Sequence, residues 1–182
     1  MNRRHALLAG AALAAALAIP AGAGAAAADE GPHDPPFESP ADYRVLCAQP
    51  WLGAGFGYNV ITGAGFIVGT PLNDLIIASN GNDVVLGLEG DDVICLLPGT
   101  DQGQGGPGDD IIFGFVGDDT ELGGTGNDVL FGDDGNDTLN GNSGDDRLSG
   151  GAGNDALDGG VHVAGDNCQG GAGADTFTDC NP

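Results

Sequence analysis

The sequence has almost no positive charge. It contains no lysine, and only two of its four arginines, Arg44 and Arg147, lie beyond residue 28, where all 27 acidic residues are found. Residues 29–182 therefore carry a net charge of −25. This charge argues against a nucleic-acid partner, because phosphates would be repelled. It also predicts strong self-repulsion of the chain unless cations neutralise it.

Residue types that usually carry catalysis are also scarce. Beyond residue 28 the only histidines are His33 and His162, and neither has a serine or cysteine partner nearby in sequence. No Gly-x-Ser-x-Gly or His-Glu-x-x-His motif occurs. An EF-hand is excluded because no glutamate closes such a loop. The four glutamates are Glu30, Glu38, Glu89 and Glu121. We therefore expect a protein that is not an enzyme.

Hydrophobic runs are confined to the N-terminus. Arg3 and Arg4 precede an apolar run from Ala6 to Ile19, and small residues follow up to Ala28. This order is typical of a secretory signal peptide, which we place at residues 1–28. The run is short for a membrane-spanning helix, and no second run exists. We therefore expect a secreted protein without a membrane span.

Glycine and aspartate, in contrast, are abundant and strictly spaced. From Gly69 to Thr178 the chain divides into twelve units of nine residues, with two extra residues in unit eleven. An aspartate occupies the sixth position at Asp74, Asp83, Asp92, Asp101, Asp110, Asp119, Asp128, Asp137, Asp146, Asp155 and Asp175. A glycine precedes it by two residues at Gly81, Gly90, Gly99, Gly108, Gly117, Gly126, Gly135, Gly144 and Gly153, as well as at Gly173. An apolar residue follows it by two at Ile76, Val85, Ile94, Ile112, Leu130, Leu139, Leu148, Leu157 and Phe177.

Each unit combines a turn with a very short strand. The six turn positions contain glycines, which tolerate positive φ and let carbonyl oxygens converge. The aspartate adds a carboxylate. Such oxygen donors, without nitrogen or sulfur, suit a hard cation with six to eight ligands, which indicates calcium. Positions seven to nine form the strand, so the residue at position eight points to one face and its neighbours to the other.

The nonapeptide resembles that of the RTX (repeats-in-toxin, haemolysin-type) calcium-binding family, written G-G-x-G-x-D-x-U-x with U apolar. Units such as residues 123–131 and 150–158 carry the resemblance, which covers about 110 residues. It implies an all-β fold, a right-handed parallel β-roll with two units per coil. It also implies several Ca²⁺ ions between stacked turns, with the aspartates and turn glycines above as the metal site. Within this family, the chain looks more like the small secreted calcium-binding proteins of actinobacteria, which have similar paired cysteines, than like members that leave by a one-step exporter.

The remaining segments and the irregular units lead to further expectations. Residues 29–50 are expected to form an extended, proline-rich leader that is ordered from about Tyr43. Residues 51–68 form an N-terminal cap, in which 60–68 make a first rung without metal, and 179–182 are a tail. Gly103 and Glu121 occupy the position at which other units have an inward-pointing apolar residue, which predicts poor packing or a bulge there. Two units are not expected to form a standard site, namely unit one, with Leu72 in place of a turn glycine, and unit eleven, with Asp166 out of frame.

Odd and even units fall on opposite sheets, and their outward residues differ. Those of the odd units form an apolar stripe, roughly 15–20 Å long, which should be covered. Its residues are Leu75, Ile77, Val93, Cys95, Ile111, Phe113, Val129 and Phe131. We predict that residues 43–68 cover it through a Cys47–Cys95 disulfide, and that Cys168–Cys180 closes the last coil. The alternative is a homodimer or cell-surface interface on this face.

These observations predict a secreted calcium-binding protein whose roll folds on binding several ions. This dependence on metal is favoured because the free energy gained by burying few apolar side chains is small compared with the entropy cost of ordering so many residues. The alternative function is an extracellular adhesion or matrix protein in which calcium is purely structural.

Overall fold

The computed structural model describes residues 40–49, 55, 57–162 and 164–181. The chain divides into two units, residues 1–34 and 35–182, and the described residues all belong to the second. The predicted signal peptide, the first part of the leader and most of residues 50–56 lie outside the described residues. Within the described residues, no helix is long and apolar enough to cross a membrane.

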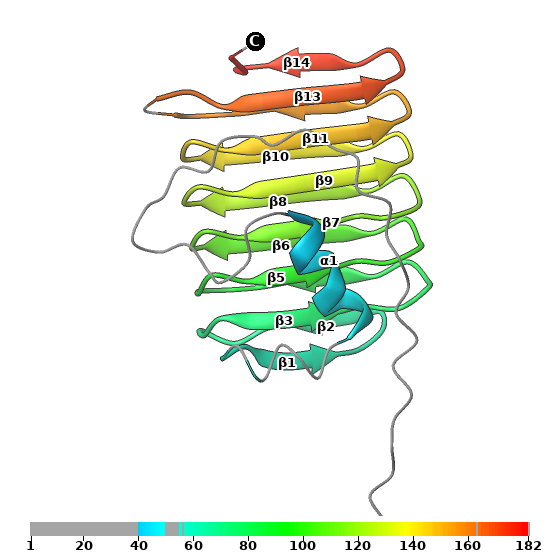
Figure 1. The fold of residues 1–182 in the computed structure, drawn as a ribbon, viewed down its shortest axis with the longest axis vertical. Coiled ribbons are helices and arrows are strands. Elements are labelled where there is room, and N and C mark those ends of the chain that lie inside the picture. Colours follow the sequence, from blue (N-terminus) through cyan, green and yellow to red (C-terminus); the bar gives the residue numbers. More distant parts are fainter. Residues whose placement is uncertain (1–39, 50–54, 56, 163, 182) are drawn as a thin grey trace, which may run out of the picture. The chain divides into compact units, whose positions relative to one another are not determined.

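Fourteen short strands form two parallel, seven-stranded sheets that lie face to face as a solenoid (Figure 1). The odd sheet contains β1 (Asn59–Thr62), β3 (Asp74–Ile77), β5 (Val93–Cys95), β7 (Ile111–Phe113), β9 (Val129–Asp134), β11 (Arg147–Ala152) and β13 (Asn167–Ala172). The even sheet contains β2 (Phe66–Val68), β4 (Val84–Leu86), β6 (Gln102–Pro107), β8 (Thr120–Thr125), β10 (Thr138–Ser143), β12 (Ala156–Asp158) and β14 (Thr176–Thr178). The predicted β-roll, with alternate units on opposite sheets, is confirmed.

The nine-residue period sets the register of both sheets. Each strand pairs with the strand one coil later, so that Ile76 lies beside Ile94 and Ile94 beside Ile112. Because strand side chains alternate, one residue of each strand points between the sheets and its two neighbours point outward. The inward residues form one continuous apolar core: Ile67, Ile76, Val85, Ile94, Ile112, Leu130, Leu139, Leu148 and Leu157. Ile61 and Ile67 form the predicted first rung.

Two details of the predicted core are wrong. Gly103 and Glu121 cause no bulge, since β6 and β8 pair in continuous register. The space beside Gly103 is filled instead, because a Cβ there would lie 3.2 Å from Leu96 Cδ1 and 3.3 Å from Ile112 Cγ2. Phe177 is 52% exposed although it occupies an inward position. It lies on β14, the last strand of the even sheet, so no further strand covers it.

The predicted extended leader is also wrong where the structure describes it, because residues Pro40–Ala48 form a helix, α1. Proline is tolerated in the first turn of a helix, and α1 ends two residues before Pro50, where a helical conformation is disfavoured. Leu46 on α1 is fully buried. The helix therefore gains its stability from packing rather than from length.

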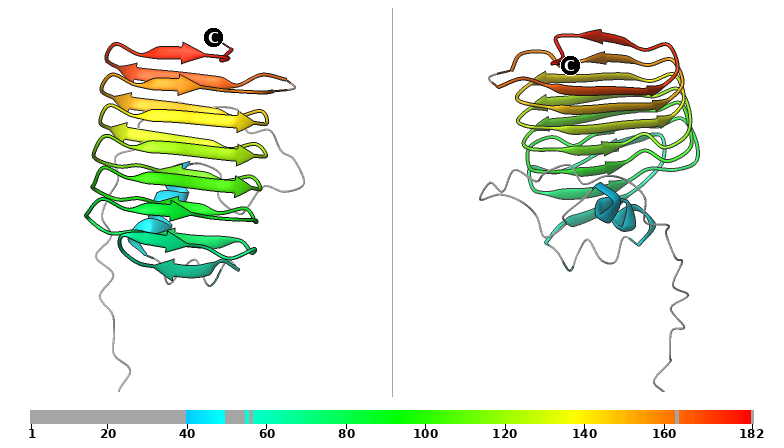
Figure 2. Two further views of the ribbon diagram at one scale, coloured as in Figure 1. Left: turned by 180° about the vertical axis from the view of Figure 1, so that it is seen from behind. Right: turned by 45° about the horizontal axis from the view of Figure 1, so that its top comes forward.

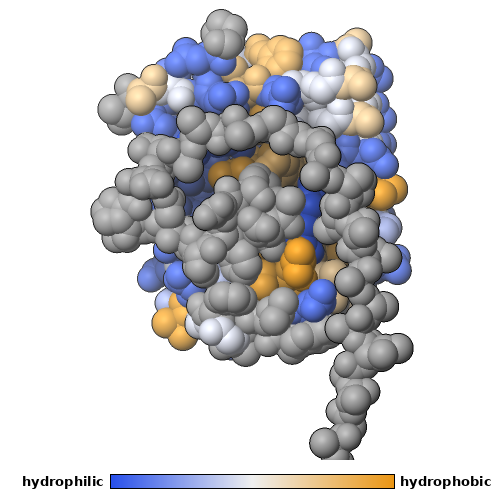
Figure 3. Space-filling model, in the orientation of Figure 1, coloured by the Kyte–Doolittle hydropathy of each residue, from blue (hydrophilic) through white to orange (hydrophobic). Residues whose placement is uncertain are grey.

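The helix α1 covers the apolar stripe on the outer face of the odd sheet (Figure 1). Leu46 and Cys47 pack against the strand residues Leu75, Ile77, Val93, Cys95 and Phe113, all of which are buried. The Cys47–Cys95 disulfide joins α1 to β5, as predicted. Five of the eight stripe residues are thus buried within a single chain and Ile111, Val129 and Phe131 are partly buried, and the structure does not support a dimer or partner interface there. In the space-filling view of this face the flanks of the described surface are mostly hydrophilic (Figure 3).

Arg44 holds α1 to the middle of the odd sheet. Its guanidinium carbon lies 4.7 Å from the ring centre of Phe113, 5.3 Å from that of Phe115 and 5.6 Å from that of Phe131. Its Nη2 also forms an ion pair with Asp133 Oδ1 at 2.6 Å. One of the two arginines beyond residue 28 thus fixes the helix by stacking and by charge.

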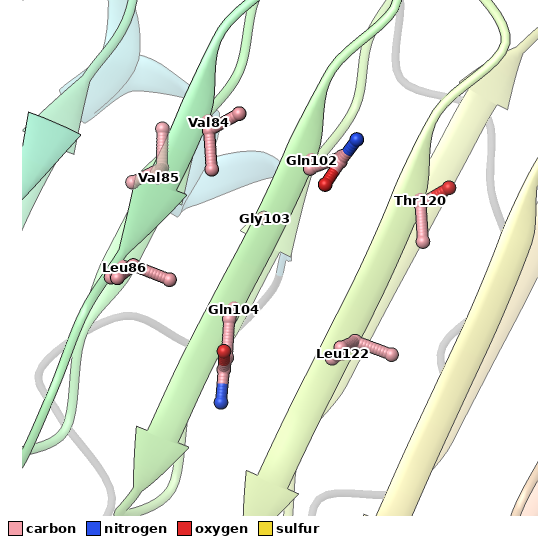
Figure 4. Close-up of a pocket in the computed structure, with 8 residues that line it drawn as sticks. All are labelled: Val84, Val85, Leu86, Gln102, Gly103, Gln104, Thr120 and Leu122. Atoms are coloured by element: carbon pink, nitrogen blue, oxygen red, sulfur yellow. The ribbon is translucent and has the colours of Figure 1, made fainter. Parts of the chain in front are cut away.

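Among the residues that the structure describes, no helix covers the outer face of the even sheet (Figure 2). A shallow hollow on this face lies over β4, β6 and β8 (Figure 4). It is lined by Val84, Val85, Leu86, Gln102, Gly103, Gln104, Thr120 and Leu122. None of these residues is titratable, and none belongs to the aspartate columns, so the hollow offers no catalytic or metal-binding groups. At the C-terminal end of the core, the second predicted disulfide joins Cys168 to Cys180.

Candidate metal centre

The aspartates at position six form two columns, one along each edge of the solenoid where the turns stack. Odd units supply Asp74, Asp92, Asp110, Asp128 and Asp146, and even units supply Asp83, Asp101, Asp119, Asp137, Asp155 and Asp175. Neighbours within a column are one coil apart, about 4.8 Å along the stack. Except for Asp175, all of these side chains are buried. A ladder of buried like charges is unstable unless each carboxylate has a partner.

One oxygen of each carboxylate has such a partner in the main chain. From Asp92 onward, Oδ1 accepts a hydrogen bond from the backbone N–H of the aspartate one coil earlier, as between Asp110 N and Asp128 Oδ1 at 2.8 Å. The bond repeats from Asp74 to the end of the solenoid with lengths of 2.7–3.1 Å. The aspartate therefore fixes the stacking of its own turn on the previous one.

The second oxygen is left without a partner. Oδ2 is buried and accepts no hydrogen bond in nine aspartates: Asp92, Asp101, Asp110, Asp119, Asp128, Asp137, Asp146, Asp155 and Asp166. Buried polar atoms nearly always have partners, so nine orphaned oxygens in two regular columns indicate a missing positive group. Among the described cations, Arg44 pairs with Asp133 on the outer face of the odd sheet, and Arg147 is exposed. His162 approaches only Asp166 Oδ2, without hydrogen-bond geometry, so none of the three neutralises the columns.

Main-chain carbonyl oxygens converge on the same points. A Cβ built on Gly141, at position one of its unit, would lie 2.7 Å from the carbonyl oxygen of Gly159, one coil later, and would also clash with Asp146 Oδ2. At position four, Gly126 has φ 130°, and a Cβ there would collide with the carbonyl oxygen of Gly108. These glycines leave space between successive turns that is lined by oxygens and closed to side chains.

Of the predicted position-four glycines, eight have positive φ: Gly90, Gly108, Gly117, Gly126, Gly135, Gly144, Gly153 and Gly173. Gly81 and Gly99 do not have positive φ. Both belong to units in which Ala78 or Leu96 replaces the glycine of position one, and both of these side chains point into the core. The even-edge turns at the N-terminal end of the solenoid therefore differ from the rest.

Burial raises the pKa of the orphaned carboxyls in the metal-free fold, and neighbouring carboxylates add to the effect. The pKa rises to about 8 for Asp92 and Asp128, to about 7 for Asp110 and Asp119, and to about 6 for Asp137 and Asp146. The hydrogen bond to Oδ1 opposes the shift without cancelling it. Raised pKa values of this kind mark sites at which a cation or a proton must neutralise the carboxylates.

Asp74 and Asp83, at the N-terminal end of the two columns, have both oxygens satisfied. Asp74 Oδ2 accepts hydrogen bonds from the backbone N–H and the hydroxyl of Thr70, at 2.5 and 3.0 Å. Asp83 Oδ2 accepts the equivalent bonds from Ser79, both at 2.8 Å, and its Oδ1 accepts one from Gly65 N. Burial tends to raise the pKa of Asp83, but these hydrogen bonds hold it below the usual value. Hydroxyl residues at position two thus replace the cation.

Asp166 corrects the expectation for unit eleven. Its Oδ1 accepts the hydrogen bond from Asp146 N at 2.8 Å, its side chain is fully buried and its Oδ2 is orphaned, as in a standard unit. His162 Nδ1 lies 2.9 Å from that Oδ2, but without hydrogen-bond geometry. The signal was present in the sequence, since Asp166 precedes Asp175 by nine residues. The insertion simply lies before it, within the turn.

A second ladder, which sequence reasoning missed, runs along the outside of both edges. Asparagine or aspartate at position five accepts a hydrogen bond from the backbone N–H one coil later, as between Asn127 N and Asp109 Oδ1 at 2.7 Å. The same bond links Asp91, Asn136 and Asn154 to other coils. These side chains are exposed, so they stabilise stacking without facing the interior.

The donor set fits a hard divalent cation. It contains carboxylate and carbonyl oxygens only, and no three His, Cys, Asp or Glu side chains cluster among the residues that the structure describes. Carbonyl oxygens must therefore supply most ligands, which is common for Ca²⁺ and rare for transition metals. One ion between each pair of turns would be held by Oδ2 of the aspartate and the carbonyl oxygens of both turns.

Comparison with known proteins gives one match. The sequence pattern of the RTX calcium-binding nonapeptide repeat, in four copies, matches residues 68–102, 97–130 and 131–161, which span more than half of the chain. Neither the curated proteins nor the solved structures compared with the chain include a match. Both the repeat and the stacked turns that it builds show that this chain belongs to the family of RTX, haemolysin-type calcium-binding repeat proteins.

Proposed function

We propose that this protein is a secreted calcium-binding protein whose solenoid folds when several Ca²⁺ ions occupy the spaces between its stacked turns. The observation that carries the proposal is the set of nine buried Oδ2 atoms without a hydrogen-bond partner. In the metal-free fold these carboxylates repel one another wherever they are ionised, or else take up protons. Each bound ion removes that repulsion and links two turns, so its binding free energy becomes folding free energy.

The secreted location is supported by two features. Two disulfides join all four cysteines, and disulfides persist in oxidising compartments. Residues 1–28 also have the composition of a signal peptide. Calcium near millimolar concentration outside the cell matches the affinity range of extracellular modules, whereas the low calcium of the cytosol would leave the chain unfolded before export. Mass spectrometry of the exported protein tests this point, and a retained N-terminus would contradict it.

A binding role without catalysis is supported by the same geometry. The aspartates that have raised pKa values are accounted for as metal ligands, and the hollow on the even sheet contains no titratable residue. No described feature favours an adhesion function over a calcium-binding one, because α1 already covers the apolar stripe.

Circular dichroism in chelator and in increasing Ca²⁺ tests the proposal. We expect a disordered spectrum in chelator at pH 7.5 and a β-rich spectrum at millimolar Ca²⁺. Mg²⁺ serves as the control, since it demands octahedral geometry and releases its water reluctantly, and it should restore little structure. A β-rich spectrum that is the same with chelator and with Ca²⁺ would overturn the proposal.

A further inference from the structure

Glu121 is a buried acid in the middle of the apolar core. It lies on β8 at the position where most other units have an inward Leu, Ile or Val, and its side chain is fully buried. Both carboxylate oxygens, Oε1 and Oε2, lack a hydrogen-bond partner. An unpaired carboxylate in an apolar core is strongly destabilising, so Glu121 must either take up a proton or have a partner that the protein part alone does not supply.

The neighbours of Glu121 on the even sheet cannot provide that partner. Gly103 and Leu139 lie beside it in the sheet register, and neither has a polar side chain. The nearby cation, Arg44, is engaged by Asp133 and lies over aromatic rings on the outer face of the odd sheet. Glu121 therefore has no neutralising group on the core side.

The carboxylate instead points toward the edge of the solenoid, into the space between two even turns. A Cβ built on Gly114 would lie 2.6 Å from Asp119 Oδ2, 2.7 Å from the carbonyl oxygen of Gly132 and 2.9 Å from Glu121 Oε1. Three oxygens thus surround one point, two from residues 119–121 and one from Gly132 on the next turn of this edge. Asp119 Oδ2 is itself orphaned. At the other position-one glycines, Gly123 and Gly141 among them, the nearest atoms come from the aspartate or from a carbonyl group of the next turn.

We propose that Glu121 is an additional ligand of the ion between the turns of residues 114–119 and 132–137, and that it reaches this site from the core side. The inference rests on the proposed calcium-binding function. It makes this site different from the others, because an extra carboxylate raises its negative charge and therefore its affinity for Ca²⁺. It also explains an acid at an apolar position, since the bound ion neutralises it.

The test compares Glu121→Leu and Glu121→Gln with wild type. Glu121→Leu restores the apolar residue found in other units, so it is expected to fold in saturating Ca²⁺. Asp118→Asn is the matched control, because it removes one charge from an exposed side chain on the same turn. Ions are counted by native mass spectrometry at several Ca²⁺ concentrations, and the folding midpoint is measured by circular dichroism.

If Glu121 is a ligand, both Glu121 variants lose one ion at limiting Ca²⁺ and one site weakens about tenfold or more, whereas Asp118→Asn keeps the wild-type count. If Glu121→Leu instead keeps the ion count and folds at lower Ca²⁺ than wild type, Glu121 is only an unfavourable core residue and the inference is wrong. If the wild-type protein shows no calcium-dependent folding, the proposed function itself is wrong. That outcome is read from the wild-type protein alone and does not depend on the variants.

Discussion

At the scale of the residue, each aspartate of the two columns that has an orphaned Oδ2 has two separate roles. In Asp128 one oxygen accepts the backbone N–H of Asp110 and the other is buried and unpaired. The first role aligns the turns and needs only an acceptor, whereas the second needs a negative charge. An amide can perform the first role but not the second.

Replacement of Asp128 by asparagine separates these roles. Asp128→Asn keeps an oxygen for the bond from Asp110 N but places an uncharged group between the turns, so we expect one or two fewer bound ions and a roughly tenfold higher Ca²⁺ midpoint. Asp109→Asn is the control, since it makes the same chemical change at an exposed side chain whose oxygen bonds Asn127 N. Equal effects of the two variants in a calcium titration would show that charge alone, and not the buried column, determines binding.

The raised pKa values predict competition between protons and Ca²⁺. Asp92, Asp110, Asp119 and Asp128 have folded-state pKa values of about 7 to 8, against an unfolded value near 4. The metal-free fold therefore binds more protons than the unfolded chain between these values, and its stability falls as the pH rises from about 4 to 8. The protonated metal-free fold becomes more stable as the pH falls, and calcium must then displace its protons, so the Ca²⁺ midpoint should rise between pH 8 and pH 6.

Calcium titrations followed by circular dichroism at pH 8, 7 and 6, at constant ionic strength, measure this dependence. Proton release on adding Ca²⁺ to a weakly buffered solution provides an independent readout. A midpoint that stays constant over this range, with no proton release, would mean that the carboxyls are already ionised in the metal-free chain, so that no protonated fold competes with Ca²⁺.

The individual residues also show how far sequence alone can reach. The aspartate column and the inward residues follow from the nine-residue period, because a fixed spacing places equivalent residues at equivalent places on a coil. Asp166 lies outside the nine-residue spacing when that spacing is counted forward from unit ten, but within it when it is counted backward from Asp175. Glu121 was recognised as an exception, but only the position of Oε1 near Gly114 shows where its carboxylate points.

At the scale of the element, the helix α1 was the least predictable part. Nine residues are too few for a stable isolated helix, and the prolines around them favour extended structure. Its stability depends on contacts with Leu75, Val93 and Phe113 on the odd sheet, which lie far away in the sequence. The apolar stripe predicted that a segment of the chain covers this face. Cys95 predicted the point on the sheet at which a disulfide attaches that segment.

The two disulfides are expected to contribute unequally. The Cys47–Cys95 bond spans 48 residues and Cys168–Cys180 spans 12, so loop-closure entropy predicts stabilisation of about 4 and about 3 kcal/mol. Removal of the first bond, by Cys47→Ala with Cys95→Ala, also releases α1 from the apolar stripe. We therefore expect a larger fall in the thermal midpoint in saturating Ca²⁺ than for Cys168→Ala with Cys180→Ala.

Differential scanning calorimetry of the two double variants measures this difference, and dye binding to exposed apolar surface reports on the stripe. The Cys47/Cys95 variant should bind more dye, whereas the Cys168/Cys180 variant should bind about as much as wild type. A larger loss of stability for the C-terminal pair would mean that closing the last coil matters more than attaching the helix.

At the scale of the whole molecule, the solenoid is a one-dimensional stack in which each coil contacts mainly the coils before and after it. Its two ends are built differently. At the N-terminal end, Thr70 and Ser79 satisfy Asp74 and Asp83 without metal, and Gly65 N donates to Asp83 as well. The first coil can therefore be stable at lower Ca²⁺ than the rest, and it provides a template on which later coils stack.

This asymmetry predicts how many ions the molecule binds. A full site needs an orphaned Oδ2 and a following turn with its own aspartate. Each such site lies between one aspartate and the aspartate one coil earlier. On the odd edge there are four, and the later aspartates are Asp110, Asp128, Asp146 and Asp166. On the even edge there are also four, and the later aspartates are Asp119, Asp137, Asp155 and Asp175. Native mass spectrometry in saturating Ca²⁺ should thus approach eight ions rather than the eleven aspartates of the predicted column. Asp74→Asn should leave this count unchanged, because Thr70 already satisfies Asp74. A count of ten or more, or the loss of an ion in Asp74→Asn, would show that hydroxyl groups do not replace the cation at the N-terminal end.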